Sequence, residues 1–303
     1  MNEQSWTERL GPLFENALAP LVGQVFSAAS IAYWSHDAGT FVTTFGGVTS
    51  ERRYDLGELT EVFTLTTFLQ QVQTGRLWLD TPVHVLLTDA DERLTFLDLL
   101  THTSGLPTTL DLTQYAEYEE RLQAIEQAKP EADAIGAVRY SPLDFMQIGL
   151  ALETLEGFPL DQMVVEAVLS PLGLLAGYGD AADENVRALD GVAGNGGLFA
   201  TVDDALAITQ MYIDEGRGAG FLSEIVTQEA ITEHRTGQGL GWNVSARDGV
   251  SIFGLRSATG CVAFGSRETP FACVVLTDAG EGGTLDPVFD RIQAALLDLL
   301  RNS

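Results

Sequence analysis

Hydrophobic residues recur at helical spacing in three parts of the chain. Residues 6–20 carry apolar side chains three and four positions apart, which predicts an amphipathic helix. A second helical pattern covers residues 59–75 and stops at Gly75, a residue suited to ending a helix. A third occupies residues 286–301. Much of residues 58–240 consists of further helical patterns and of loops that proline and glycine punctuate.

Strand-like runs lie near both ends of the chain. Residues 27–37 and 40–49 are rich in β-branched and aromatic side chains, and Ala38-Gly39 between them predicts a hairpin. Strands at both ends with helices between them predict an α+β fold, in which an antiparallel sheet built from both termini is flanked by helices and joined to a large central helical region. Four short runs near the carboxyl end supply the later strands: GLGWNVSA (239–246), SIFGLRSA (251–258), CVAFGS (261–266) and FACVVLTDAG (271–280).

We expect residues 1–303 to form one unit, because no internal repeat or linker separates independent domains. Residues 1–57 and 241–303 are predicted to form the α/β part that holds the sheet. Residues 58–240 are predicted to form the mainly helical part. A cleft between the two parts is a common place for a ligand site.

The net charge is −27, from 43 acidic and 16 basic residues, and it argues against anionic binding partners. Such a field repels nucleic acids and anionic membrane surfaces, so we expect neither as a partner. No stretch approaches the roughly 18 uncharged apolar residues of a membrane span, and residues 1–20 lack the apolar run of a signal peptide. We therefore expect a cytoplasmic protein with no membrane span. The oligomeric state stays open.

The histidines, cysteines and glycines indicate neither a metal nor a cofactor. The four histidines share no metal-ligand spacing such as H-x-x-x-H. Cys261 and Cys273 flank a predicted hairpin, and a reduced, buried pair is expected rather than a disulfide in the cytoplasm. GVAGNGG, residues 191–197, lacks the following lysine and preceding strand of a phosphate-binding loop, so it predicts a tight turn.

Six motifs follow one another along the chain: GRLWLDTPV (75–83), LTFLDLLTHTSGLP (94–107), YSPLDFMQIGLALETLEGFPLD (140–161), SPLGL (170–174), DENVRALDGVAGNGGLFATVDDALAITQMYI (183–213) and GLGW (239–242). In this order they resemble the serine β-lactamase and penicillin-binding-protein superfamily, in particular class C β-lactamases, DD-peptidases and related esterases. The resemblance covers nearly the whole chain and implies the serine β-lactamase/DD-peptidase-like fold.

The family's first catalytic cluster is S-x-x-K at a helix start, where one helical turn places the lysine beside the nucleophilic serine. The matching segment here is YDLGELTEVFT. Glu58 therefore stands at the serine position and Glu61 at the lysine position. A carboxylate at position 58 cannot form the usual acyl-enzyme as a serine does, and a carboxylate at position 61 supplies no cation.

The family's second cluster, Y-x-N, uses its tyrosine as a proton relay and its asparagine to orient substrate. Tyr140 and Ser141 match the first two positions, but Pro142 stands at the third. The resemblance thus implies a relay without its amide partner. It also makes Ser141 and Pro142 candidate residues of the ligand-binding cleft.

The third cluster is K-T-G or H-x-G on the strand that lines the cleft, which binds the substrate carboxylate and helps to form the oxyanion hole. Its counterpart here is Leu255-Arg256-Ser257, also a candidate part of the cleft. Because side chains alternate along a strand, we expect Leu255 and Ser257 to face one way and Arg256 the other. A surface position is expected for Arg256, although a substrate carboxylate, Glu58 and Glu61 are alternative partners.

Glu58 and Glu61 lie three residues apart on one helix face, and two interpretations stay open. Two acids crowded in a partly dry cleft form a general acid and a general base, with Tyr140 nearby. Acids in a first helical turn also favour the positive end of the helix dipole, by about 0.3 to 1 kcal/mol each, and need no further role.

The sequence offers weaker support for three other candidate catalytic residues, which are His102, Ser104 and Cys261. The resemblance places His102 and Ser104, in THTSGLP, at a helix end and turn away from the nucleophile position, so no catalytic role is expected for them. Cys261 follows Thr259-Gly260 near the cleft, but it has no evident histidine partner.

The leading functional hypothesis is a pseudoenzyme of this superfamily, in which serine acyl transfer is absent and the cleft binds a small-molecule ligand or a partner. The alternative is a hydrolase of a small ester or amide that uses Glu58, Glu61 and Tyr140 in place of the serine nucleophile. A third, weaker hypothesis is a structural or regulatory subunit whose cleft is filled by its own side chains, Leu255 among them.

Overall fold

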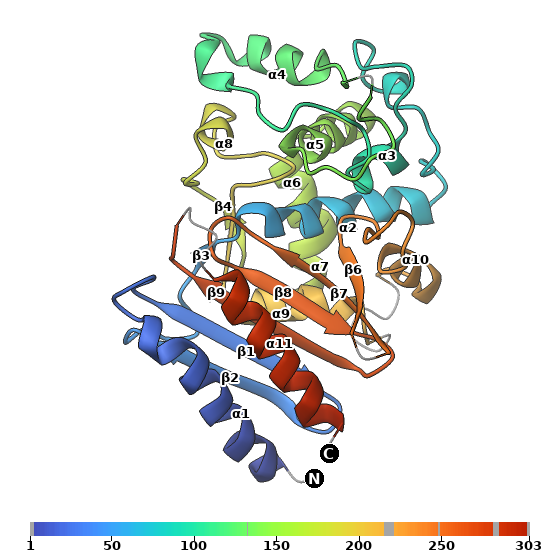
Figure 1. The fold of residues 1–303 in the computed structure, drawn as a ribbon. Helices are drawn as coiled ribbons and strands as arrows, with labels where there is room; N and C mark the ends of the chain where they lie inside the picture. Colours follow the sequence, from blue (N-terminus) through green and yellow to red (C-terminus); the bar gives the residue numbers. More distant parts are fainter. Residues whose placement is uncertain (1–2, 132, 215–220, 248, 281–284, 302–303) are drawn as a thin grey trace.

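The computed structural model describes residues 3–131, 133–214, 221–247, 249–280 and 285–301, which form a sheet part and a helical part (Figure 1). The sheet has six antiparallel strands in the order β2-β1-β9-β8-β7-β6. Near its middle, β1 from the amino-terminal end pairs with β9 from the carboxyl-terminal end, which confirms the predicted α+β fold. The strands are β1 (Ala29–Ser35), β2 (Gly39–Phe45), β6 (Asn243–Arg247), β7 (Val250–Arg256), β8 (Val262–Ser266) and β9 (Phe271–Thr277).

Two helices cover the outer face of this sheet, α1 (Glu3–Leu18) and α11 (Asp286–Arg301), and they run beside each other in Figure 1. Their apolar stripes pack on the alternate side chains of β1, β8 and β9. Trp6, Leu10 and Phe14 of α1 lie four residues apart and are fully buried in this layer. Each such side chain contributes about 1.5–3 kcal/mol by leaving water.

The inner face packs against α9 (Val202–Met211), and α2 (Thr60–Gln73) crosses the molecule between the sheet and the helical part (Figure 1). Every side chain of α2 from residue 60 to residue 69 is buried, so the helix belongs to the core on all sides. It ends just before Gly75, whose φ of 72° is the left-handed conformation that the sequence predicted for a helix stop.

The helical part also holds a small sheet, in the order β3-β5-β4, that the sequence did not predict. Its strands, β3 (Tyr54–Asp55), β4 (Gly177–Tyr178) and β5 (Leu198–Ala200), are too short to show an alternating pattern.

None of the described helices is long and apolar enough to cross a membrane. The remaining helices are α3 (Phe96–Leu100), α4 (Tyr118–Glu126), α5 (Pro142–Glu156), α6 (Leu160–Val164), α7 (Ser170–Leu172), α8 (Glu184–Ala188) and α10 (Glu224–Ala230), with the single-turn segments η1 (Ala19–Leu21), η2 (Gly57–Leu59), η3 (Val83–Val85), η4 (Leu112–Gln114) and η5 (Val165–Leu169).

The GVAGNGG segment forms the tight turn that the sequence predicted, closed by the pairing of Ala193 with Gly196. The turn is held between two helices. Thr64 of α2 donates a hydrogen bond to the Gly194 carbonyl over 2.8 Å. On the other side, a Cβ atom at Gly194 would overlap the carbonyl oxygen of Phe145 in α5. Only glycine therefore lets the turn approach α5 so closely.

We expect Gly194→Ala to lower the free energy of unfolding by about 1–3 kcal/mol, because the added methyl group must displace the α5 backbone. Gly11→Ala is the matched control. Its site in α1 has open space around the added atom, and alanine favours a helix interior over glycine by about 0.5–1 kcal/mol. Urea unfolding of both variants tests this expectation, and a Gly194→Ala variant as stable as wild type would contradict it.

Candidate functional site

Glu58 lies in η2, directly before α2, where the chain must turn sharply. Asp55 accepts a hydrogen bond from the Gly57 backbone N–H over 3.0 Å, and Gly57 takes a positive φ of 50°. A Cβ atom on Gly57 would overlap the Ser257 hydroxyl. The glycine therefore allows the segment after β7 to lie against η2.

The Glu58 carboxylate ties η2 to that segment. Its Oε2 atom accepts one hydrogen bond from the Ser257 hydroxyl and one from the Ala258 backbone N–H, each 2.8 Å long. A further bond, from the Thr259 hydroxyl to the Asp55 carbonyl over 2.9 Å, fastens the same two segments. Glu58 is partly exposed, so this contact lies at the surface of the site rather than in the core.

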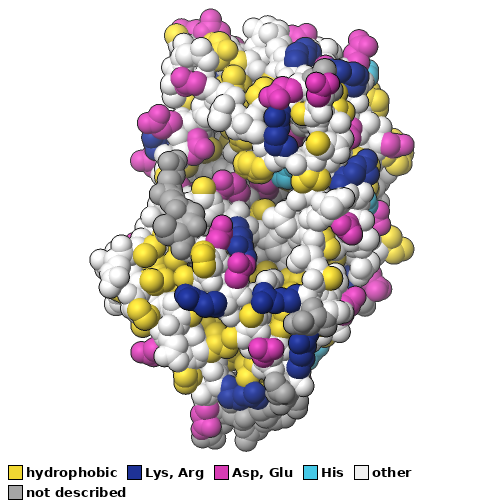
Figure 2. All heavy atoms as spheres, viewed as in Figure 1, with side chains coloured by type: hydrophobic (Ala, Val, Ile, Leu, Met, Phe, Trp, Pro, Cys, Tyr) yellow, Lys and Arg dark blue, Asp and Glu magenta, His cyan; other side chains and the backbone are white. Residues whose placement is uncertain are grey.

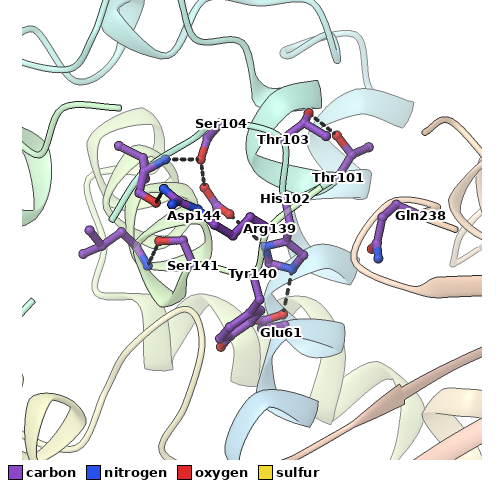
Figure 3. Close-up of polar contacts among 12 residues, drawn as sticks. Glu61, Thr101, His102, Thr103, Ser104, Arg139, Tyr140, Ser141, Asp144 and Gln238 are labelled. Atoms are coloured by element: carbon purple, nitrogen blue, oxygen red, sulfur yellow. Dashed lines mark hydrogen bonds and ion pairs between the residues drawn. The ribbon is translucent and has the colours of Figure 1, made fainter. Parts of the chain in front are cut away.

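Glu61 lies in the first turn of α2 and is completely buried. The Tyr140 hydroxyl donates a hydrogen bond to its Oε1 atom over 3.1 Å. The other oxygen, Oε2, lies 3.5 Å from Nε2 of His102. Figure 3 shows these three side chains converging from α2, from the loop after α3 and from the loop before α5.

His102 continues this chain of contacts to a second carboxylate (Figure 3). Its Nδ1 atom lies 2.8 Å from Oδ2 of Asp144, in the first turn of α5. The Ser104 hydroxyl donates to Oδ1 of the same carboxylate over 2.5 Å. All these side chains are buried. His102 therefore contacts Glu61, at the position that matches the family's lysine, although nothing in the sequence indicated that the two side chains would meet.

Backbone pairing between two loops produces this arrangement. The His102 carbonyl accepts a hydrogen bond from the Arg139 N–H, and the Thr103 carbonyl accepts one from the Gly136 N–H, both over 2.8 Å. The loop before α5 thus follows the loop after α3 and brings Tyr140 to His102, with ring centroids 5.0 Å apart. Loops paired in this way leave no periodic pattern in the sequence, so no signal there could locate His102.

Burial and mutual contact shift the pKa values of the cluster. Burial raises the pKa of Glu61 to about 7, although His102 opposes the shift. Burial alone lowers the pKa of His102, but its hydrogen bond to Asp144 and its contact with Glu61 outweigh that effect and raise the pKa to about 10. Burial likewise raises the pKa of Asp144. Burial and the carboxylates of Glu61 and Glu58 raise the pKa of Tyr140 well above its usual range, so its hydroxyl stays protonated.

Asn195, in the turn between α8 and β5, is a further site residue that the sequence analysis missed. Its side chain lies near enough to Tyr140 to oppose the upward shift of the tyrosine pKa that burial causes. Asn195 exposes 5% of its surface, and its Oδ1 atom has no hydrogen-bond partner. The GVAGNGG pattern predicted the turn but not the position of the Asn195 side chain. That position depends on how the turn packs between α2 and α5.

Two of the predicted cleft residues do not contribute side chains to the site. Ser141 is buried as the amino-terminal cap of α5, where its hydroxyl accepts from the Leu143 N–H and donates to the Pro107 carbonyl. Pro142 is the first residue of that helix, a position that favours proline because the missing N–H needs no partner. Both residues serve the start of α5.

The β7 residues divide between the two faces of the sheet. Ser257, just beyond the strand, meets Glu58, and Leu255 is buried in the core on the side of α2. Arg256 faces away, where it pairs with Asp286 and Asp290 of α11. Arg256 therefore lies on the α11 side of the sheet, the direction that strand alternation predicted.

Cys261 is fully buried, and burial raises the pKa of its thiol to about 12. A thiol in this state supplies almost no thiolate near neutral pH, so the cysteine is unsuited to nucleophilic attack. Cys261 and Cys273 are both free thiols. Among the side chains in the described ranges, no group of three His, Cys, Asp or Glu residues is arranged to hold a metal ion.

A hollow marks the waist of the molecule (Figure 2), and the hydroxyl of Tyr140 is buried although much of its side chain is exposed. Figure 2 shows this hollow between the helical part and the sheet part, with acidic side chains at its edge. Tyr140 exposes 39% of its surface while its hydroxyl points inward to Glu61. The Tyr140 hydroxyl thus lies inside while part of its side chain is exposed, and Glu61 is buried beneath it.

Comparison with known proteins gives a family match and one curated relative. Residues 14–297 match the family described as Beta-lactamase. A putative D-alanyl-D-alanine carboxypeptidase of Escherichia coli O157:H7 is 24% identical over 256 residues, which covers 63% of this chain and 58% of that protein. The chain therefore spans less than two thirds of the length of this relative.

Solved structures resemble the chain over nearly its whole length. A penicillin-binding protein from Bacillus halodurans has a TM-score of 0.73 at 19% identity, covering 96% of this chain and 99% of its own. A D-amino acid amidase from Ochrobactrum anthropi SV3, complexed with L-phenylalanine, has a TM-score of 0.76 at 16% identity with the same coverage. SurE with D-Leu reaches 0.79 at 18% identity, covering 97% of this chain and 76% of its own. At these identities the likeness shows the fold alone.

Removing the charge of Asp144 tests the buried cluster. We expect Asp144→Asn to lower the free energy of unfolding by about 3–5 kcal/mol at pH 7, because it leaves a buried imidazolium with one anion fewer. Glu229→Gln is the control. It breaks a more exposed pair with His234, 3.5 Å apart, and is expected to change stability by less than about 1 kcal/mol. Equal losses for the two variants in urea unfolding would contradict the expectation.

The difference in the free energy of unfolding between wild type and Asp144→Asn is also expected to depend on pH. The pKa of His102 is about 10 in the folded protein and 6.5 ordinarily, so its charge stabilises the fold fully below pH 6.5. This contribution is lost as the pH rises through about 10. The stability advantage of wild type over Asp144→Asn is therefore expected to shrink between pH 7 and pH 10.

Proposed function

Because the chain belongs to the Beta-lactamase family, matched over residues 14–297, we propose that it is a catalytically inactive member whose cleft binds a small-molecule ligand. The observation that carries this proposal is the carboxylate of Glu58, at the position of the family's nucleophile, held by the Ser257 hydroxyl and the Ala258 N–H. Glu61 stands in place of the lysine and brings a second carboxylate instead of a cation.

The hydrogen bonds of Glu58 support inactivity for an electrostatic reason. Acyl transfer develops negative charge on the substrate oxygen, and hydrolases stabilise that charge with preorganised donors. Ser257 and Ala258 belong to the segment that resembles the family's oxyanion-hole strand, and both donate to Glu58 instead. A carboxylate at this place also repels a second negative charge by about 4 kcal/mol at 4 Å, for an effective dielectric constant near 20.

A hydrolase of small esters or amides is the second candidate. The pKa of Glu61, near 7, suits a general acid or base at neutral pH, and the hydrogen bond from Tyr140 gives it a neighbouring donor. This candidate requires the Glu61 carboxylate to exchange protons with a bound substrate. The two functions differ in whether Glu61→Gln and Glu58→Gln abolish a measurable turnover.

We expect the purified wild-type protein to match buffer on a chromogenic cephalosporin, a short-chain nitrophenyl ester and D-phenylalanine amide. No covalent adduct with a penicillin should appear in intact mass spectrometry, because no serine stands at position 58. An active serine β-lactamase serves as the assay control. Turnover by wild type that Glu58→Gln or Glu61→Gln removes would establish the second candidate, and a penicillin adduct in the cleft would refute the first.

A further inference from the structure

The turn that follows β7, at residues 257–261, keeps its shape through bonds within the sheet part. The Ser257 N–H donates to the Cys261 carbonyl over 2.9 Å, and the Gly260 N–H donates to the Ser257 carbonyl over 3.1 Å. From β9, the Thr277 hydroxyl donates to the Gly260 carbonyl over 2.8 Å. Gly260 has a φ of 83°, a left-handed conformation that favours glycine. The shape of the 257–261 turn therefore does not depend on the side chain at position 58.

Two donors of this turn converge on one oxygen atom of Glu58. The Ser257 hydroxyl and the Ala258 N–H each lie 2.8 Å from its Oε2 atom. An oxyanion held at such distances by a hydroxyl and a backbone N–H makes charge-assisted hydrogen bonds. Ala258 is exposed, and Ser257 and Glu58 are partly exposed, so solvent reaches this contact. The turn thus presents a pair of donors suited to a carboxylate, and Glu58 occupies it.

The protons of the turn show which donor depends most on Glu58. Thr259 donates its single hydroxyl proton to the Asp55 carbonyl, so towards Ser257, 2.7 Å away, it can only accept. Ser257 can therefore direct its proton either to Glu58 or to Thr259. Among the described residues, the Ala258 N–H has the Glu58 carboxylate as its one acceptor. Without a carboxylate in this place, the Ala258 N–H is the donor left over.

Glu58 itself is carried on a segment that the helical part holds in place. The two carboxylate oxygens of Asp55 accept from the Gly57 N–H over 3.0 Å and from the Ala182 N–H over 2.8 Å. The Glu58 side chain therefore bridges two segments that are fixed independently of it. A group tethered beside its site has a high effective concentration, millimolar or above, so a carboxylate from solution competes poorly with it.

We propose that Glu58 is an internal ligand that keeps a preformed carboxylate-binding turn closed. In the native protein the Ser257 hydroxyl and the Ala258 N–H are engaged by the protein's own carboxylate, so the turn takes none from solution. It binds a small carboxylate when the Glu58 side chain is withdrawn. This inference rests on the proposed function, since it states how the same cleft is regulated.

The charge of the protein separates such a site from non-specific binding. A net charge of −27 repels anions in general, and Glu58 repels a second carboxylate at this place. In Glu58→Ala that local repulsion is gone, whereas both donors stay. Glu61 remains, but its buried oxygens face Tyr140 and His102. If Glu58 served only the dipole of the following helix, its removal would leave no carboxylate site.

Glu58→Ala with acetate is the first test, because the substitution deletes one methylene group and the carboxylate, which together match acetate. The probe is the backbone amide resonance of Ala258 in isotope-labelled protein, titrated with sodium acetate against sodium chloride at constant ionic strength. We expect saturable binding with a dissociation constant on the order of 10 mM, because two charge-assisted hydrogen bonds must offset the ordering of a small ligand. Wild type and the isosteric control Glu58→Gln should bind acetate at least about tenfold more weakly.

A second variant tests whether the ligand takes the place of the missing side chain. Glu58→Gly deletes one carbon atom more, so propionate is its match. The ratio of propionate to acetate affinity is expected to be about threefold to fourfold higher in Glu58→Gly than in Glu58→Ala, the effect of burying one methylene group. An equal ratio in the two variants would count against binding in the place of Glu58.

The donors are tested in the Glu58→Ala background. Adding Ser257→Ala is expected to weaken acetate binding about threefold to tenfold, since one of two hydrogen bonds to a charged group is lost. Ser245→Ala is the matched control. It removes an exposed hydroxyl from β6 and should leave acetate binding unchanged. Equal losses for the two added substitutions would contradict the assignment of the donors.

The outcomes separate this inference from the proposed function. If the Ala258 resonance responds to acetate in wild type as it does in Glu58→Ala, or in neither, the internal ligand is wrong, while an inert wild-type protein still supports the pseudoenzyme. If wild type hydrolyses an ester or amide, the proposed inactivity is wrong, and acetate binding to Glu58→Ala still supports the internal ligand. Should Glu58→Ala fail to fold in chloride, recovery of folded protein in acetate supports the proposal and failure in both salts counts against it.

Discussion

A buried imidazolium between two buried carboxylates organises the centre of this protein. His102 lies 2.8 Å from Asp144 and 3.5 Å from Glu61, and these two acids are completely buried. A charge taken out of water is costly unless opposite charges and hydrogen bonds surround it. The three side chains come from α5, the loop after α3 and α2, so their electrostatic pairing also fixes how these segments meet. The positive φ of 51° at His102, unfavourable for a residue with a Cβ atom, is held by the same contacts.

The second constraint is the bond between η2 and the segment after β7. Glu58 accepts from Ser257 and Ala258 across the junction of the helical part and the sheet part. Gly57 makes that approach sterically feasible. A serine nucleophile at position 58 would leave the Ala258 N–H free for a substrate oxygen. The Glu58 carboxylate instead accepts a hydrogen bond from this N–H and so ties the helical part to the sheet part.

The distribution of charge follows from these two features. The family pattern of serine and lysine places a neutral nucleophile and a cation at the start of α2, whereas this chain places two acids there. Glu58 is turned to the protein's own donors, whereas the two oxygens of Glu61 face Tyr140 and His102.

The sequence determined the fold because packing follows periodic patterns. The apolar stripe of α1, the predicted helices around α2 and α11 and the strand runs at both ends were all recoverable, since burial alternates with periods near 3.6 and 2. The family motifs also located Glu58, Glu61 and Tyr140 along the chain, although not their partners. Short strands such as β3 and β4 were not recoverable, because two residues show no period.

Only the tertiary structure decided which polar side chains meet. His102 and Asp144 are separated by 42 positions, and they meet because the loops around residues 103 and 136 pair through their backbones. The turn that carries Asn195 lies beside α2 and α5 because Thr64 binds the Gly194 carbonyl and Gly194 fits against Phe145. Ser141 and Arg256 were drawn away from the site by a helix cap and by two acids of α11. The sequence determined the elements through their periodicity, whereas the site arose from long-range contacts between loops, which have none.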